Sequence, residues 1–283
     1  MRGPVHVVGA SGRSGVALCR ALMARGQEFV PVVRNAAKWA DLGLPGEARI
    51  ADLNEPMTLV PALEGAGVVV SCAHARHAPA LLAAAPAMAS FVLLGSTRRF
   101  SRWPDAHGKG VIAGEQALLA SGRGGVILHP TMIYGAQGED NVRRLAALMR
   151  RLPLLALPGG GANLVQPIHQ DDLTACILAA LDRDWSSPHA VVVAGPQPVS
   201  YADFTRAIAD AAGMGRLPIV NLPGWLLIAA TPLTLLPGLP YIRIAEVRRL
   251  MEDKAFPVDE MKLLLGVNPI SLQEGLRRTF SGS

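Results

Sequence analysis

A glycine-rich turn behind a short apolar run constrains the fold of this chain most. Residues 4–8 are mostly apolar, and Gly9, Gly12 and Gly15 follow at a spacing of three. Apolar side chains then recur at helical spacing over residues 16–25, up to Gly26, and residues 29–33 form a second apolar run. This order predicts a strand, a tight turn, a helix and a second strand, the context in which such a turn binds a dinucleotide.

Apolar runs continue to alternate with helical patterns along the chain. Further strands are predicted at residues 48–50, 67–71, 91–95, 126–129, 164–168 and 190–193, and helices at about 57–64, 78–88, 112–121 and 140–151. Ser200 is a predicted N-cap for a helix that reaches Ala212. Strands that alternate with helices predict a parallel sheet covered on both faces.

We therefore predict an α/β fold: a doubly wound parallel Rossmann sheet with a small, mostly helical C-terminal substrate-domain portion. Residues 1–135 are expected to form the cofactor-binding domain. Residues 136–283 are expected to be a mixed segment that returns to the sheet at about 164–195 and otherwise forms the substrate domain. Half of the 283 residues are hydrophobic and 17% are charged, which suffices for a sizeable core.

The glycine turn and the ends of the strands give the predicted cofactor contacts. Gly9 permits the tight turn, Gly12 lets the backbone approach a pyrophosphate, and Gly15 lets the helix pack closely. The helix N-terminus adds free N–H groups and partial positive charge. An ordinary glycine-rich turn is the alternative interpretation. The predicted contacts are Gly9, Ser11, Gly12, Arg13, Ser14, Gly15, Arg34, Lys38, Asp52, Leu53, Ser71, Cys72, Ala73, Pro130 and Thr131.

Basic side chains at the end of the second predicted strand favour NADP(H) over NAD(H). NAD-specific turns place an acidic side chain there to accept hydrogen bonds from the ribose hydroxyls. This chain has Arg34 instead, with Lys38 four residues later and Arg13 in the turn. Three cations near one point suit a 2′-phosphate, although solvated side chains remain the alternative. Asp52 is expected either to accept from the adenine amino group or to cap a turn.

Composition limits the compartment and the partners. Cys19, Cys72 and Cys176 lack disulfide or metal-ligand spacing, so we expect a reducing compartment and no metal site. Without a leader pattern or an unbroken run of about 18 apolar residues, a cytoplasmic location is expected, with the inner face of a membrane as an alternative. The net charge is +5, but the arginines are dispersed, so we expect no nucleic-acid partner.

Several segments resemble the extended or atypical short-chain dehydrogenase/reductases, a superfamily that includes NAD-dependent epimerases and dehydratases. These segments are Gly9-x-x-Gly12-x-x-Gly15, Asp52-Leu53, the His129–Gly135 stretch His-Pro-Thr-Met-Ile-Tyr-Gly, Val165–Asp172 and Ala194–Tyr201. In the third, His129 replaces the usual Arg. The chain is most similar to the branch with the 39-kDa accessory subunit of respiratory complex I and NmrA-like proteins, which implies NADP(H) and, often, an incomplete catalytic set.

The resemblance implies a catalytic tyrosine, a lysine four residues later and a hydroxyl at the fifth strand. The hydroxyls of Ser96 and Thr97 match the last feature, with a capping role as the alternative. The segment Gly114–Leu118 anchors the alignment and places His107 at the tyrosine position and Val111 at the lysine position. His107 is therefore a candidate proton donor, against an ordinary loop histidine, and Lys109 a candidate replacement cation.

Residues 222–241 are rich in leucine and proline and are followed by Arg243, Arg248 and Arg249. The prolines exclude one uninterrupted helix. Either two short helices close the substrate domain, or the segment makes a peripheral membrane contact with the arginines at the headgroups.

Two functions therefore remain open for this chain. One is an NADP(H)-dependent oxidoreductase that acts on a small apolar carbonyl or quinone-like substrate. The other is a non-catalytic NADP(H)-binding subunit or redox sensor with a protein-complex partner. A nucleotide-sugar epimerase is disfavoured because its tyrosine is missing.

Overall fold

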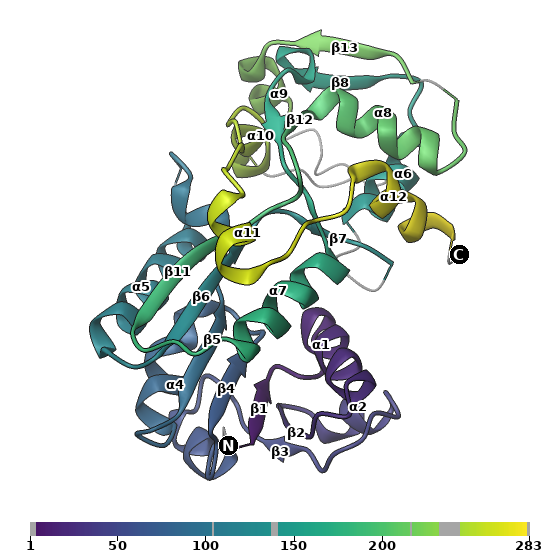
Figure 1. The fold of residues 1–283 in the computed structure, drawn as a ribbon. Coiled ribbons are helices and arrows are strands. Elements are labelled where there is room, and N and C mark those ends of the chain that lie inside the picture. Colours follow the sequence, from purple (N-terminus) through teal and green to yellow (C-terminus); the bar gives the residue numbers. More distant parts are fainter. Residues whose placement is uncertain (1–3, 104, 137–140, 216, 232–243, 282–283) are drawn as a thin grey trace.

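A seven-stranded parallel sheet forms the larger of two lobes (Figure 1). The structure is a computed structural model that describes residues 4–103, 105–136, 141–215, 217–231 and 244–281. The strand order is β11-β6-β5-β4-β1-β2-β3. The strands are β1 (Val5–Val8), β2 (Phe29–Val33), β3 (Arg49–Ile50), β4 (Val68–Ser71), β5 (Ser90–Leu94), β6 (Gly125–Pro130) and β11 (Pro188–Val193). The predicted Rossmann sheet is confirmed.

Helices cover both faces of this sheet, as a doubly wound fold requires (Figure 1). One face packs against α1 (Arg13–Ala24), α7 (Gln170–Asp182) and α11 (Asp259–Leu265), and α2 (Ala36–Ala40) also joins this layer through Trp39. The other face packs against α3 (Leu59–Ala62), α4 (Ala78–Ala84) and α5 (Ala106–Ser121). Because both faces are buried, the strands are apolar without alternation, which is what made them visible in the sequence.

The smaller lobe lies above the carboxyl ends of the strands and has its own apolar core around Tyr134, Phe204, Ile208 and Leu276 (Figure 1). Its helices are α6 (Asn141–Met149), α8 (Tyr201–Ala211), α9 (Gly224–Ala230), α10 (Ile244–Leu250) and α12 (Leu272–Ser281). Its short strands are β7 (Ile133–Tyr134), β8 (Leu155–Pro158), β9 (Leu164–Val165), β10 (Ile168–His169), β12 (Val199–Ser200) and β13 (Ile219–Leu222).

The segment predicted to return to the sheet at about 164–195 does so only through β11, which pairs with β6. β9 and β10 instead pair with β12 and β7 outside the main sheet. Pro167 lies between them, and a proline without an N–H cannot continue a central strand. The predicted single strand over 164–168 is therefore wrong, and α7 and β11 supply the return to the sheet.

The long helix α5 begins six residues earlier than residue 112, where the sequence pattern predicts it. The Asp105 carboxylate accepts a hydrogen bond from the Gly108 backbone N–H at 2.8 Å and caps the helix there. The predicted cap at Ser200 is confirmed, because its Oγ accepts from the Asp203 N–H at 3.0 Å. The predicted helix 57–64 is a 3-10 turn, η1 (Pro56–Thr58), followed by α3.

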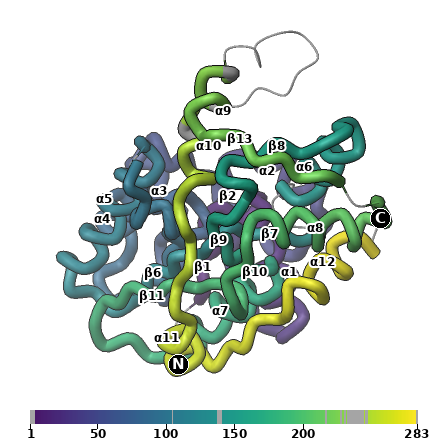
Figure 2. The backbone as a smooth tube through the Cα atoms, turned by 90° about the horizontal axis from the view of Figure 1, so that it is seen from above, coloured from purple at the N-terminus to yellow at the C-terminus, as the bar shows by residue number. Residues whose placement is uncertain are grey.

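The C-terminal segment between α10 and α11 crosses the molecule from the smaller lobe to the sheet (Figure 2). Of the apolar stretch 222–241, residues 232–241 lie outside the described residues. Within the described part, the Trp225 side chain on α9 is 68% exposed. No helix among the described residues is long and apolar enough to cross a bilayer. Membrane contact through this stretch stays a prediction.

Candidate functional site: a dinucleotide cleft at the carboxyl ends of the strands

The glycine turn has the geometry that close approach of a dinucleotide requires. Gly9 has a φ of +75°, and its N–H donates to the Val32 carbonyl at 2.9 Å. A Cβ on Gly15 would collide with the Gly9 carbonyl and lie 2.8 Å from the Ala10 Cα. Gly12 is the N-cap of α1 and has no side chain to cover the N–H groups of the first turn. The turn therefore leaves a helix N-terminus open to an anion.

A cavity of about 240 Å³ adjoins this turn at the ends of β1, β2 and β3. Five predicted cofactor residues line it, namely Gly9, Ser11, Arg34, Asp52 and Leu53. One Asp52 oxygen accepts from the Asn54 backbone and side-chain N–H groups at 2.9 and 3.1 Å, so it shapes the loop after β3. The position corresponds to the adenosine half of a dinucleotide in a Rossmann fold.

The predicted cations do not all reach this cavity. Arg34 lines it, and its guanidinium has no hydrogen bond or ion pair among the residues that the structure describes. Lys38 is exposed on α2 and is not part of the lining. Arg13 is the exposed first residue of α1 and is also outside the lining. Arg76 and His77, which follow β4, also line the cavity, and Arg76 is the one that the sequence did not single out.

The carboxyl ends of β4 and β6 lie at the same edge of the parallel sheet as this cavity. Cys72 and Ala73 follow β4 and lie against Gly9. A Cβ added to Gly9 would be 3.4 Å from the Ala73 nitrogen. Ser71, the last residue of β4, is buried. Burial also raises the pKa of the neighbouring Cys72 thiol to about 12, so this thiol stays protonated. Thr131 after β6 is also buried, and its hydroxyl has no partner within the described part of the chain. An orphaned hydroxyl at a strand end fits a cleft that receives a polar ligand.

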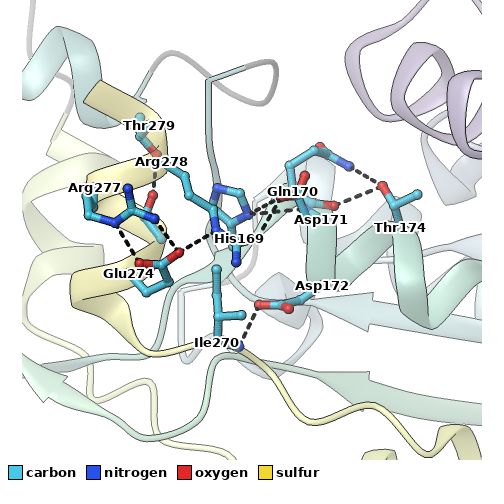
Figure 3. A network of polar contacts seen from close by, with 11 residues as sticks. His169, Gln170, Asp171, Asp172, Thr174, Ile270, Glu274, Arg277, Arg278 and Thr279 are labelled. Atoms are coloured by element: carbon cyan, nitrogen blue, oxygen red, sulfur yellow. Dashed lines mark hydrogen bonds and ion pairs between the residues drawn. The ribbon is translucent and has the colours of Figure 1, made fainter. Parts of the chain in front are cut away.

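Ser14 contacts the protein rather than pointing freely into the cleft. Its hydroxyl donates to the Gln170 side-chain oxygen at 3.2 Å, and so joins α1 to the start of α7. Figure 3 shows Gln170 within a polar network that also includes Asp171, Asp172 and the α12 residues Glu274 and Arg278. This network fixes the N-terminus of α7 between the two lobes.

The hydroxyls predicted at the end of β5 are both used within the protein. The Ser96 Oγ accepts from the Arg98 N–H at 3.2 Å and caps η3 (Thr97–Phe100). The Thr97 hydroxyl donates to the Pro130 carbonyl at 3.3 Å, which ties β5 to β6. These contacts match the capping interpretation, although the Ser96 hydroxyl proton remains available to a ligand.

Beneath these hydroxyls lies a buried charged cluster that the sequence did not predict. Glu115 Oε2 is 2.8 Å from both Arg99 Nε, with which it forms an ion pair, and His129 Nε2, with which it makes a close polar contact. The other His129 nitrogen, Nδ1, accepts from the Ser96 N–H at 3.2 Å. A Cβ on Gly95 would collide with Nδ1 of the His129 ring and lie 2.6 Å from its Cε1. The cluster therefore holds the backbone at Ser96, and Gly95 leaves room for it.

His107, at the position expected for tyrosine, lies against a second histidine. The rings of His107 and His74 are edge to face with centroids 4.1 Å apart. His74 also fills the space beside Gly110, where a Cβ would lie 3.0 Å from its ring. Burial and the neighbouring Arg98 lower the pKa of His107, and burial and His107 lower that of His74 to about 4. Both rings are therefore neutral at pH 7.

Lys109 lies on a different face of α5. It is exposed and shares its stripe with the exposed residues Ala113 and Gln116, at the spacing of one helix face. Val111, at the expected lysine position, is buried. The described part of the cleft therefore contains no Tyr–Lys pair at this position.

An aromatic pair and the C-terminal segment lie beyond His129, whose ring centroid is 6.5 Å from that of Phe100. The Phe100 ring is 5.5 Å from the Phe256 ring, and Phe100 is 48% exposed. Glu252 accepts from the Ser101 hydroxyl and the Arg102 N–H, and Arg249 pairs with Asp105 at 3.1 Å. These contacts fasten residues 249–256 beside the segment that joins β5 to the start of α5, a placement that sequence spacing does not reveal.

Comparison with known proteins identifies a nucleotide-binding domain in the part of the chain that contains the glycine turn. Residues 9–101 match a family model described as NAD(P)H-binding. A curated relative, the NAD(P)H azoreductase of Xenophilus azovorans, is 27% identical over 217 residues, which are 74% of each chain.

Solved structures share the fold over nearly the whole length. The NADPH-dependent quinone oxidoreductase of Escherichia coli in complex with NADPH is 18% identical, with a TM-score of 0.77 over 98% of this chain and 99% of that one. The UDP-glucose 4-epimerase of Thermotoga maritima is 14% identical, with a TM-score of 0.75 over 98% and 97%. The chain thus carries an NAD(P)H-binding Rossmann domain, within a fold shared by quinone-oxidoreductase and epimerase structures.

Proposed function

We propose that this protein is an NADP(H)-dependent oxidoreductase that acts on an apolar carbonyl or quinone-like substrate. The observation that carries the proposal is Arg34 at the end of β2, unpartnered among the described residues in the cavity beside the glycine turn. A guanidinium there offers paired donors to a 2′-phosphate, whereas NAD-specific sites place a carboxylate at this point.

The other end of the cleft supports a flat, apolar acceptor. The half-exposed Phe100 ring and its neighbour Phe256 offer a surface on which a conjugated ring can stack. The names of two similar proteins, a quinone oxidoreductase and an azoreductase, agree with such an acceptor. NADPH, when bound, supplies a hydride to the acceptor.

The proton for the reduced acceptor would come through His107. The ring is half-buried at the start of α5, and contact with His74 fixes its orientation. Because its pKa is lowered, the protonated ring is a stronger acid than an ordinary imidazolium, and it would recover its proton from solvent. Ser96, whose hydroxyl proton is not committed, would donate a hydrogen bond to the acceptor oxygen.

A non-catalytic NADP(H)-binding subunit or sensor is the second candidate. It is favoured by the contacts that Ser96 and Thr97 make within the protein and by the outward position of Lys109. In this case the cofactor would act as a ligand that reports the redox state to a protein partner.

One series of measurements on the purified chain distinguishes the two candidate functions. NADPH and NADH are titrated by reduced-nicotinamide fluorescence, and loss of NADPH absorbance is then followed with a panel of quinones, apolar ketones and azo compounds. Tighter NADPH binding with turnover supports the oxidoreductase. Tight binding without turnover supports the second candidate, and NADH binding equal to NADPH refutes the assignment of Arg34.

A further inference from the structure

We infer that Arg76, held in place by His77, is the second cation that binds the 2′-phosphate of NADP(H), opposite Arg34. Both residues belong to the 3-10 turn η2 (Ala75–His77) after β4, and both line the same cavity as Arg34. The inference rests on the proposed NADP(H) specificity and adds to it a cation that reaches the site from a different strand.

The two nitrogens of the His77 ring show how Arg76 is held. His77 Nδ1 is 3.1 Å from the Leu53 carbonyl, which can only accept, so this nitrogen carries the proton. Nε2 is then free to accept, and it receives the Arg76 Nε–H at 3.0 Å. The guanidinium is thereby fixed through His77 to the end of β3, and its two terminal nitrogens have no partner among the described residues.

The charges around the cavity support an anionic ligand. The cavity lining carries two guanidiniums, of Arg34 and Arg76, and one carboxylate, of Asp52. Neither arginine forms an ion pair within the described part of the chain. Two unpaired arginines lining one small cavity repel each other unless an anion lies between them. A phosphate dianion accepts hydrogen bonds from both, which is the strongest form of such contacts.

Lys38 provides a matched comparison for Arg76. Lys38 lies four residues after Arg34 in the sequence but outside the cavity lining, whereas Arg76 is 42 residues away and lines it. If Arg76 binds the 2′-phosphate, its substitution should weaken NADPH binding and substitution of Lys38 should not. Sequence spacing alone would favour Lys38 for this role.

The test measures binding of NADPH, NADH, 2′,5′-ADP and 5′-AMP to the full chain by titration calorimetry. Arg76→Gln is expected to weaken NADPH and 2′,5′-ADP by about tenfold or more, the loss of one charge-assisted contact. NADH and 5′-AMP should bind as to the wild type, and Lys38→Gln should leave all four unchanged. His77→Phe, which removes the acceptor, should reproduce part of the loss.

The double variant Arg76→Gln/His77→Phe tests whether His77 acts through Arg76. It should lose no more 2′,5′-ADP affinity than Arg76→Gln alone, because the two residues form one unit. Equal losses of NADPH and NADH in Arg76→Gln would overturn the inference, since Arg76 would then contact a part shared by both cofactors.

An unchanged Arg76→Gln variant, beside an Arg34→Gln variant that loses NADPH preference, would also overturn the inference and leave the proposed specificity standing. A wild type without preference for NADPH would refute both.

Discussion

The two ends of the cleft use their polar side chains in opposite ways. At the adenosine end, Arg34 and Arg76 have no carboxylate partner within the described residues. At the opposite end, Ser96, Thr97, Glu115 and His129 all contact other groups of the protein. Side chains whose partners lie within the protein stabilise the fold, whereas uncompensated charges beside a cavity indicate a ligand. The proposed cofactor binding and the proposed hydride chemistry therefore depend on different groups of side chains and can be tested separately.

The largest expected effect is on stability at the β5–β6 end. Glu115→Ala should lower the free energy of unfolding by about 3 kcal/mol, because it leaves the buried His129 ring and the Arg99 guanidinium without their shared carboxylate. Denaturant unfolding measures the loss, with exposed Gln116→Ala as the control. An unfolding midpoint equal to that of the wild type would show that the cluster does not stabilise this end.

The next effect separates catalysis from binding. His107→Asn should lower kcat by about 100-fold, the lower range for loss of a general acid, and leave the Kd for NADPH unchanged. The pKa of His107 lies below its ordinary value of 6.5. The wild-type rate should therefore rise as the pH falls below 6.5, because more imidazolium forms. The variant should lack this rise. A rate in His107→Asn equal to that of the wild type would exclude His107 as the proton donor.

A smaller effect is expected at the adenosine end. Arg34→Asp should weaken NADPH binding by about 1–3 kcal/mol, since it removes a charge-assisted contact and adds a repelling carboxylate. NADH should bind at least as well as to the wild type, because a carboxylate at this point can accept from ribose hydroxyls. Fluorescence titration measures both, and Arg20→Asp on the exposed face of α1 serves as the control for net charge. A parallel loss for NADH would contradict the assignment.

The smallest effect concerns Lys109. Lys109→Ala should change the free energy of unfolding by less than about 0.5 kcal/mol, as for other exposed positions, and should leave turnover and NADPH affinity unchanged. The same assays and unfolding measurements check it. A clear loss of turnover would place this cation in the chemistry and remove the contrast between the two ends of the cleft.

Short-range patterns in the sequence predicted much of the fold and, within the candidate site, the glycine turn and Arg34. Buried parallel strands read as apolar runs, and the glycine spacing predicted the turn whose geometry Gly9 and Gly15 confirm. Arg34 could also be assigned, because its position follows from the end of β2. The start of α5 was missed, since Gly108 and Gly110 hide a helix that Asp105 caps.

The sequence by itself determined the glycine turn, the parallel sheet and the cation at β2, because local sterics and periodicity fix them. Only the tertiary structure decided that Arg76 replaces Lys38 at the cavity, that His74 lies against His107, and that Glu115 contacts His129. Each of these contacts joins segments brought together by strand order and by close helix packing at Gly110 and Gly114. Side-chain convergence of this kind depends on the pairing of distant strands, which no local pattern encodes.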